Sequence, residues 1–494
     1  MTNFSWIDGS IVGLYIVATM IAGIAVRKYV GKVEHFLIAG REMNLYLGIA
    51  SLAATEFGIV TCMYTSQNGY RNGFAGATPG ILAMLAMFFV GYTGFCVKPL
   101  RDAGVITIPE LFEKRYGPRI RWAAGVVIVL GGLLNMGVFL RTGGDFLVAV
   151  CGFDPKYLEI TMTALLVFVA IYTVLGGMLS VLVTDFLQFV VMSGGLLAVT
   201  ILILVNVGWT DLVAAVQKNY GAGGFNPLVK PDMGWKYIAD NALLSLAMVL
   251  TWQTTIQRLL AAKDTKTGCQ VYTRTSVFFL CRWLIPVLWG IAALAVLDPA
   301  EIGDNTLLAM PTMLSRLTPV GLMGILVAAM LAADMSTDAS YMLTWSSVIY
   351  NDILAPFHKN QWSEKRGLIV SRSLVAIIGV FLLVYGLWYP LQGSLWDYLR
   401  VTGNIYLSSM SVLLVACCYW KRSNSWGAAG AILCGAAIPS AFLVLEQVPA
   451  TSHFARDIVG PHLSNIATYV IAGIAMVIGS LLKPRAKAIG TEGA

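Results

Sequence analysis

Runs of about 20 apolar residues follow one another along most of the chain, and short polar or basic loops separate them. A run of this length matches a helix that crosses the hydrocarbon core of a bilayer, and it is longer than a strand of a membrane β-barrel. The pattern therefore predicts an all-α integral membrane protein with about thirteen transmembrane helices. The predicted spans are residues 8–27, 45–70, 74–97, 121–150, 158–178, 184–207, 236–260, 275–298, 317–350, 367–389, 395–420, 426–447 and 463–483.

One predicted span, 317–350, contains an unusually polar stretch at residues 331–340. This stretch carries two carboxylates and three hydroxyls, from Asp334, Asp338, Ser336, Thr337 and Ser340. Ionisable groups at membrane depth cost about 2.5–3.5 kcal/mol each on insertion scales, and they mark places where a polar species is held or moved. Hydroxyl and carbonyl oxygens are the donors that a small hard cation prefers. We therefore expect an ion site here.

Two other spans are too polar in the middle to be plain helices. They contain Ala-Thr-Glu-Phe-Gly at residues 54–58 and Thr-Trp-Gln-Thr-Thr at residues 251–255. The two spans lie five apart and have opposite orientations, which indicates an inverted repeat with its binding site at the midplane. The predicted organisation is a peripheral N-terminal helix and cytoplasmic loop (1–44), a first repeat (45–207), a second repeat (208–420), and peripheral C-terminal helices with a tail (421–494).

Composition agrees with a membrane protein, because 57% of the residues are hydrophobic and 12% are charged, against about 25% charged in soluble chains. Basic residues gather in the loops after the first, third, seventh, ninth and eleventh spans. The positive-inside rule then predicts an external N-terminus and a cytoplasmic C-terminus in the plasma (inner) membrane. The net charge of +7 is explained by these loops and implies no nucleic-acid partner. The basic Arg27-Lys28 pair follows the first span, which predicts a retained helix rather than a removed signal peptide.

The sequence lacks the motifs of common enzyme sites, such as a His/Cys/carboxylate metal cluster, a Gly-rich phosphate loop or a nucleophile elbow. An enzyme is therefore not expected. Several other motifs stand in order along the chain: residues 36–41, 107–117, 175–178 with 184–188, and the pair Gln257-Arg258. Together with thirteen spans, they resemble the sodium:solute symporters, and among them the proline, sialic acid and choline symporters most. The resemblance runs from about residue 8 to residue 420, and it implies the inverted-repeat leucine-transporter fold.

The resemblance also implies two cation sites. The family's shared sodium site corresponds here to Ala54, Phe57, Ala333, Ser336 and Thr337. The alternative is that the hydroxyls of Ser336 and Thr337 only donate hydrogen bonds to carbonyls one turn earlier in their own helix. A second sodium site, present in some members, corresponds to Asp185, Ser336, Asp338 and Ser340. Ala339 stands where such members have a further hydroxyl, and Asp338 beside it would compensate. Asp185 has an alternative role as a cap at the start of a helix.

The expected solute site lies at the midplane, lined by Glu56, Thr61, Asn135, Trp252 and Gln253. A lining with one acidic and one aromatic side chain suits a small zwitterion or an amine-bearing solute. A sugar or a carboxylate is an alternative substrate that the sequence does not exclude. Glu56 itself has four candidate roles: sodium ligand, partner of an ammonium group, proton carrier, or a neutral hydrogen-bonded group. Choline is disfavoured, since only Trp252 matches the aromatic cage that a quaternary ammonium needs. Arg141 and Asp145 stand four apart and are expected to form an ion pair.

These observations predict a sodium-coupled secondary symporter that imports a small polar organic solute by alternating access, with Na⁺ as the coupling ion and the lipid bilayer as its surroundings. Two alternatives stay open at this stage. One is a proton-coupled carrier of the same fold that uses Glu56, Asp334 or Asp338. The other is a membrane receptor that binds the solute without transporting it.

Overall fold

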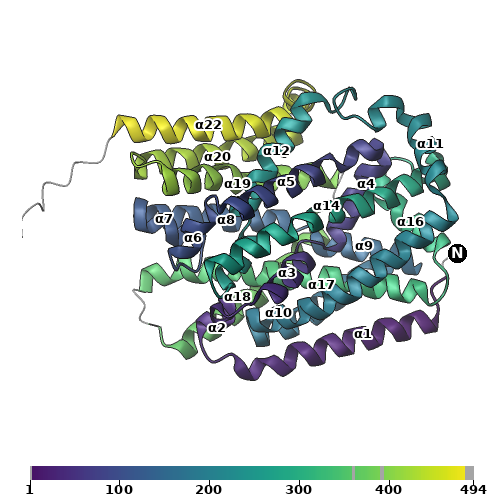
Figure 1. The fold of residues 1–494 in the computed structure, drawn as a ribbon, viewed down its shortest axis with the longest axis horizontal. Coiled ribbons are helices and arrows are strands. Elements are labelled where there is room, and N and C mark those ends of the chain that lie inside the picture. The colour runs from purple at the N-terminus through teal and green to yellow at the C-terminus, as the bar shows by residue number, and fades with distance from the viewer. Residues whose placement is uncertain (1–2, 359–361, 390–393, 484–494) are drawn as a thin grey trace, which may run out of the picture.

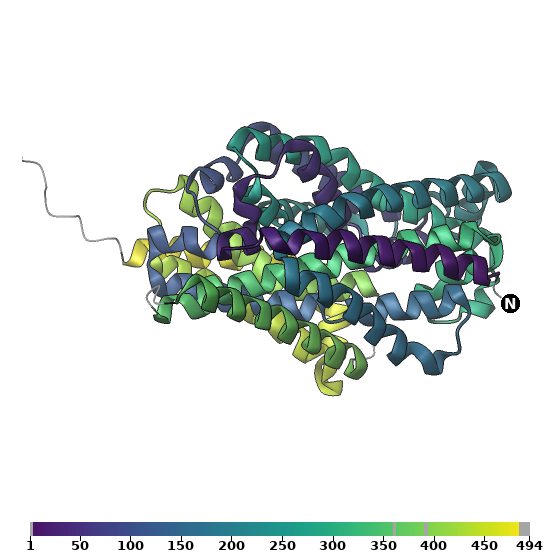
Figure 2. The same ribbon diagram turned by 90° about the horizontal axis from the view of Figure 1, so that it is seen from below.

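The computed structural model describes residues 3–358, 362–389 and 394–483, and most of these residues lie in helices that run along the long axis of the molecule (Figures 1 and 2). The helices are α1 (Trp6–Ala25), α2 (Val33–Ile38), α3 (Leu45–Thr55), α4 (Ile59–Asn72), α5 (Thr78–Thr93), α6 (Val97–Asp102), α7 (Ile108–Tyr116), α8 (Pro118–Met136), α9 (Phe139–Cys151), α10 (Leu158–Asn206), α11 (Trp209–Tyr220), α12 (Gly234–Thr251), α13 (Gln253–Ala261), α14 (Thr265–Val296), α15 (Pro299–Ile302), α16 (Ala309–Leu317), α17 (Leu322–Val348), α18 (Glu364–Trp388), α19 (Leu395–Tyr419), α20 (Ser425–Gln447), α21 (Pro449–His453) and α22 (Gly460–Leu482).

Ten helical stretches among the described residues are long and apolar enough to cross a membrane. Two of them, Ile59–Thr93 and Pro155–Asn206, each include parts of two predicted spans. The second is bent at Gly177, whose φ of 52° is easy only for glycine. Helices α12 and α13 occupy the remaining predicted span, 236–260. The prediction of an all-helical, multi-span membrane protein is confirmed.

Both expected helix interruptions are present. The first follows Thr55, where α3 ends, and the extended Gly58 (φ −101°, ψ 174°) leads into α4. The second lies at Trp252, whose ψ of 112° leaves the helical region between α12 and α13. Unwound backbone is tolerated at membrane depth only where it is buried in protein or lines a cavity. Both interruptions are buried, which indicates that the binding site lies beside them.

Helix α17 is the centre of the bundle, because nearly all its side chains are buried. It packs against α1, α3, α10 and α18. A Cβ added to Gly58 would lie 2.7 Å from the Thr337 hydroxyl oxygen, so this glycine permits the close approach of α17 to the first interruption. At the other side of the bundle, α20 and α22 pack on each other and on α19 (Figure 1).

The two ends of the bundle differ in their loops. Helix α1 begins at one end, and α22 finishes at the opposite end, where α6 and α7 also lie (Figures 1 and 2). Helices α6 and α7 carry Lys98, Arg101, Lys114 and Arg115. The basic helices of this one predicted loop therefore lie at the same end of the molecule as the finish of α22. Residues 484–494 of the predicted tail lie outside the described residues.

Candidate functional site

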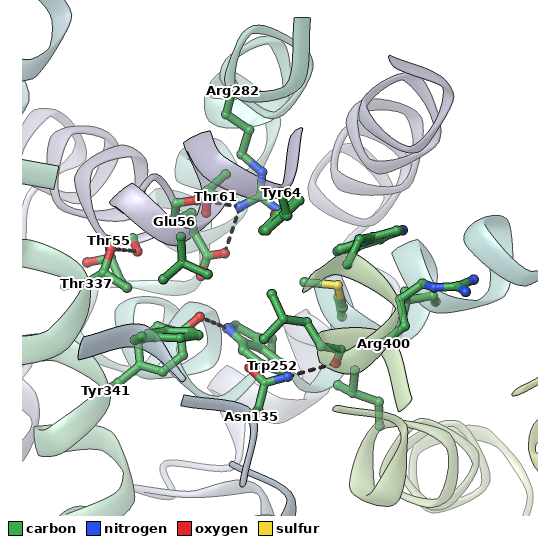
Figure 3. A pocket seen from close by; sticks show the side chains of 17 residues that line it. Thr55, Glu56, Thr61, Tyr64, Asn135, Trp252, Arg282, Thr337, Tyr341 and Arg400 are labelled. Atoms are coloured by element: carbon green, nitrogen blue, oxygen red, sulfur yellow. Dashed lines mark hydrogen bonds and ion pairs between the residues drawn. The ribbon is translucent and has the colours of Figure 1, made fainter. Parts of the chain in front are cut away.

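A narrow cavity of about 50 Å³ lies beside the two interrupted helices. Its walls come from the α3–α4 and α12–α13 interruptions and from α8, α14, α17 and α19 (Figure 3). Four of the five expected solute residues line it, namely Glu56, Thr61, Asn135 and Trp252. Gln253 is fully buried and is not among the lining residues, and its amide has no hydrogen-bond partner among the described residues. The place of Gln253 in the solute site therefore stays a prediction.

Glu56 is fully engaged by other side chains. Its Oε1 accepts hydrogen bonds from the hydroxyls of Thr254 and Thr255, at 2.9 Å each. Its Oε2 lies 3.0 Å from Nη1 of Arg282 on α14, and the same nitrogen donates to the Glu56 carbonyl at 2.7 Å (Figure 3). The two interrupted helices therefore meet at this carboxylate, and an ion pair neutralises its charge.

Arg282 was missed as a site residue. The available signal was a basic residue inside the predicted span 275–298, because a charge at membrane depth marks a functional or paired position. The sequence gives no indication that its partner stands 226 residues earlier. Arg282 is 4% exposed and lines the cavity, so both charges of the pair stand at the wall.

An aromatic cluster forms the wall opposite Glu56. The Trp252 ring stacks on Tyr406, with centroids 5.7 Å apart and planes inclined by 23°. Its indole N–H donates to the Tyr341 hydroxyl at 3.0 Å (Figure 3). Asn135 donates to the carbonyl of Leu399 at 2.8 Å, which fixes the orientation of its amide. Trp252 is thus held rigidly at the cavity, as a platform requires.

A stacked pair of rings separates this cavity from a second one. Tyr64 and Trp396 lie 4.9 Å apart with an interplanar angle of 27°, and both line both cavities. The second cavity, of about 320 Å³, is here called the vestibule. Its polar lining includes Gln67, Asn68, Arg71, Lys230, Asp397 and His462. Any solute that passes between the two spaces by this route must displace the Tyr64–Trp396 pair.

A charged network stands behind this partition. Arg400 is fully buried and pairs with Asp240 of α12 and with Asp397, the latter at 2.5 Å. His462 of α22 brings its Nδ1 to 2.8 Å from the Asp240 carboxylate. Arg400 also lines the first cavity. Helix α22 is thus connected through two side chains to the wall of the candidate solute site.

The residues expected at the shared sodium site lie around the first interruption. The Thr337 hydroxyl is 3.0 Å from the carbonyl oxygen of Thr55 and 3.0 Å from that of Ala333. The contact with Ala333 is the expected bond one turn back within α17, and the contact with Thr55 reaches the end of α3. Ala54, Phe57 and Ser336 are buried within the same region. Neutral hydroxyl and carbonyl oxygens suit a monovalent hard cation.

The residues expected at the second sodium site surround a guanidinium group. Asp185 accepts hydrogen bonds from Ser336 and from Ser51, each at 2.5 Å, and its Oδ2 lies 3.2 Å from Nη2 of Arg258. Ser340 accepts from the same nitrogen at 2.5 Å. Asp185, Ser336 and Ser340 thus come together as expected. The alternative role of Asp185 as a helix-start cap is wrong, because Asp185 lies well inside α10 and its carboxylate faces three other helices.

Asp338 does not join that cluster. Its Oδ1 has no hydrogen-bond partner among the described residues, and none of the contacts of Asp185 involves it. The suggestion that Asp338 compensates for Ala339 therefore stays a prediction. The pair Arg141–Asp145 forms as expected, at 4.0 Å, and Arg141 donates to the carbonyl of Gly386 on α18 at 3.1 Å.

Comparison with known proteins adds independent findings. The model of the sodium:solute symporter family matches residues 36–435. The chain is 25% identical to sodium/glucose cotransporter 4 of Danio rerio, over 96% of this chain and 77% of that protein. It is 26% identical to the sodium/mannose cotransporter of Bos taurus, over 98% and 88%, and 25% identical to the sodium/myo-inositol cotransporter of Mus musculus, over 97% and 73%. A solved structure of a Na⁺-coupled sialic acid symporter superposes with a TM-score of 0.83 at 18% identity, over 99% of this chain and 100% of that one.

Proposed function

Since this chain belongs to the sodium:solute symporter family, and is a sodium-coupled solute symporter rather than an enzyme, we propose that it imports a small polar solute without net charge by alternating access. Its fold is the expected leucine-transporter fold. The solute binds in the cavity between Glu56 and Trp252. Na⁺ binds at Ala54, Phe57, Ala333, Ser336 and Thr337.

The position of Thr337 supports the sodium site. Its hydroxyl touches carbonyls on both sides of the contact between α3 and α17, so an ion there ties the interruption to α17. Glu56 directly follows Thr55 in the chain and lines the solute cavity. An ion that fixes the Thr55 backbone therefore also fixes this part of the cavity wall. Each ligand then meets part of the ordering cost of the other, and the coupling is reciprocal. One Na⁺ that enters down about 100 mV releases roughly 2.3 kcal/mol, and a tenfold gradient adds about 1.4 kcal/mol.

The ion pair between Glu56 and Arg282 carries the proposal for the solute. A carboxylate without a partner would favour an amine, but this one has a guanidinium at 3.0 Å. The wall is therefore electrically neutral, and what it offers is hydrogen-bonding groups and the Trp252 ring. A neutral polyhydroxy compound is the first candidate, in line with relatives named for glucose, mannose and myo-inositol.

A zwitterion is the second candidate. Both members of the Glu56–Arg282 pair line the cavity, so a solute with both charges has a counter-charge for each.

For the orientation, we propose an external N-terminus and a cytoplasmic C-terminus in the plasma membrane. This is supported by the basic helices α6 and α7, which share an end of the bundle with the finish of α22.

Uptake into proteoliposomes tests the proposed function. Purified protein is given an inward Na⁺ gradient and a panel of labelled sugars, polyols, neutral amino acids, amines and carboxylates. We expect accumulation of a neutral or zwitterionic solute, and no accumulation when K⁺ replaces Na⁺. Accumulation driven by a pH gradient without Na⁺ would support the proton-coupled carrier instead. Na⁺-dependent binding without accumulation would support the receptor.

A further inference from the structure

One nitrogen atom of His462 faces both members of a buried ion pair. Arg400 of α19 pairs through Nη1 with Oδ2 of Asp240 on α12, and the side chains of both residues are fully buried. The Nδ1 atom of His462, on α22, lies 2.8 Å from that Arg400 nitrogen and 2.8 Å from that Asp240 oxygen. Three helices therefore meet at three atoms, and the imidazole nitrogen lies beside both the donor and the acceptor of the pair.

The imidazole can satisfy only one of these two neighbours at a time. Without a hydrogen on Nδ1, the ring accepts a hydrogen bond from Arg400, whose guanidinium is always charged in proteins. With a hydrogen on Nδ1, as in the imidazolium, the ring donates to Asp240 and carries a charge that repels Arg400. Both groups use the same oxygen of Asp240, because Oδ1 has no hydrogen-bond partner among the described residues. A proton on His462 therefore competes with Arg400 for Asp240.

Protons reach His462 from the vestibule. Its side chain is 20% exposed and belongs to the vestibule lining, whereas the side chains of Asp240 and Arg400 have no exposed surface. Histidine is the side-chain type that commonly gains its charge between pH 5 and 8. The site is therefore placed to respond to the pH of the vestibule.

The other titratable groups near this imidazole come from several elements. Glu446 of the neighbouring helix α20 is paired with Arg456, at 3.2 Å. The groups that face the network are Asp240 and Tyr237 of α12, Asp397 and Arg400 of α19, Tyr469 of α22 itself, Arg71 of α4, and Lys230 and Asp232 of the segment before α12. The imidazole contacts Asp240 and Arg400 directly, so these two determine what its charge does.

Arg400 carries the competition to the partition formed by Tyr64 and Trp396. Its ion pair with Asp240 ties α19 to α12, and its second pair, with Asp397, stays within α19. Trp396 stands one turn before Arg400 on the same face of α19, and its ring stacks on Tyr64 at 4.9 Å. Loss of the Asp240 contact therefore leaves the turn that carries Trp396 without its charged link to α12.

We propose that His462 is a positioning residue that makes the partition respond to the pH of the vestibule. As a neutral ring it leaves Asp240 to Arg400, and the partition stays closed. As an imidazolium it takes Asp240, Arg400 keeps only Asp397, and the solute cavity becomes more accessible from the vestibule. The proposal goes beyond the proposed function, and it depends on neither the identity of the solute nor that of the coupling ion.

The reactivity of a cysteine placed in the solute cavity measures this access. Val60 lines the solute cavity but not the vestibule, and Met233 lines the vestibule but not the solute cavity. Val60→Cys and Met233→Cys are each labelled with a maleimide in purified protein, and labelling at the introduced cysteine is followed by peptide mass spectrometry. The ratio of the first labelling rate to the second cancels the ordinary pH dependence of the thiol reaction.

We expect this ratio to rise at least about threefold as the pH falls from about 8 to about 5.5, the range in which histidine commonly gains its charge. His462→Asn keeps a hydrogen-bonding group near the Nδ1 position and does not titrate, so it is expected to abolish the rise. His453→Asn is the matched control, because the His453 side chain is 80% exposed and pairs with Asp457, at 3.7 Å. This control variant is expected to keep the rise.

A ratio that is independent of pH in otherwise wild-type protein would overturn the proposal. A rise of equal size in His462→Asn would overturn it as well, because the titrating group would then lie elsewhere. If His462→Asn does not fold, His462→Gln takes its place and the same two outcomes apply. A histidine with a merely structural role would change the ratio equally at every pH when it is replaced, and that result would also contradict the proposal.

Discussion

Replacement of Glu56 by glutamine removes one charge from the cavity wall and leaves its shape nearly unchanged. The Thr254 and Thr255 hydroxyls keep an acceptor in the glutamine oxygen, so those two bonds survive. What is lost is the partner of Arg282, at 3.0 Å. At an effective dielectric constant of about 20, the attraction between two unit charges at that distance is roughly 5–6 kcal/mol. Breaking a buried pair on one side costs about 3–5 kcal/mol, because the remaining charge has no partner.

We therefore expect Glu56→Gln to lower the melting temperature of the purified protein by several degrees. Arg282→Met should do the same, because it leaves the carboxylate without its partner. In the double variant Glu56→Gln/Arg282→Met, the drop in melting temperature should be smaller than the sum of the two single drops, because no buried charge is left without a partner. Thermal unfolding followed by intrinsic fluorescence measures all three.

The same variants separate the pairing role of Glu56 from direct sodium binding. If Glu56 were a sodium ligand, Glu56→Gln would raise the sodium concentration for half-maximal uptake, and Arg282→Met would not restore it. If Glu56 mainly neutralises Arg282, the single variant should favour anionic solutes, and the double variant should return to neutral ones. Purely additive melting shifts in the double variant would refute the pairing argument.

Three further outcomes are expected from the same cavity. Thr337→Ala should raise the half-saturating sodium concentration of uptake at least about tenfold, the equivalent of about 1.4 kcal/mol, and an unchanged sodium titration would contradict this. Gly58→Ala should also weaken sodium binding, because the new Cβ would stand 2.7 Å from the Thr337 oxygen; wild-type sodium affinity would show that the two helices separate without loss. Trp252→Phe should keep solute KM within a few-fold, because a ring remains for the solute to pack against. Trp252→Ala removes that ring and should raise the solute KM about tenfold or more at saturating sodium, the equivalent of about 1.4 kcal/mol. Equal KM values in both variants would remove the platform role.

The two helix interruptions were predictable from the sequence because their signal is local. Polar residues at 54–58 and 251–255 break an apolar run, and the physical cost of burying them is the same in any fold. The contacts of Glu56 were not predictable, because Arg282 reaches it across a distance of 226 residues. Which face of one helix meets which face of another depends on packing that a single sequence does not specify.

Asp185 and Asp338 illustrate the same limit within one candidate site. Both are acidic and both belong to the predicted second sodium site, but among the described residues only Asp185 has hydrogen bonds to the other groups there. A rotation of about 100° per residue separates Asp338 from its neighbour Thr337, so a one-position difference decides which helix a side chain meets. Arg258 was visible as part of a motif, and its place beside Asp185 required the structure.

The wall of the solute cavity depends on His462, a residue that lies beyond the region matched by the family model. The match to the family ends at residue 435, whereas α22 begins at Gly460 and sends His462 to the Asp240 carboxylate beside Arg400. The last helices are therefore not an interchangeable module that can be swapped between relatives at the end of the shared region. A chimera joined at that point would combine Asp240 and Arg400 of one protein with the last helices of another, so their contact with His462 would be lost. A segment exchanged to transfer solute selectivity should therefore include α22.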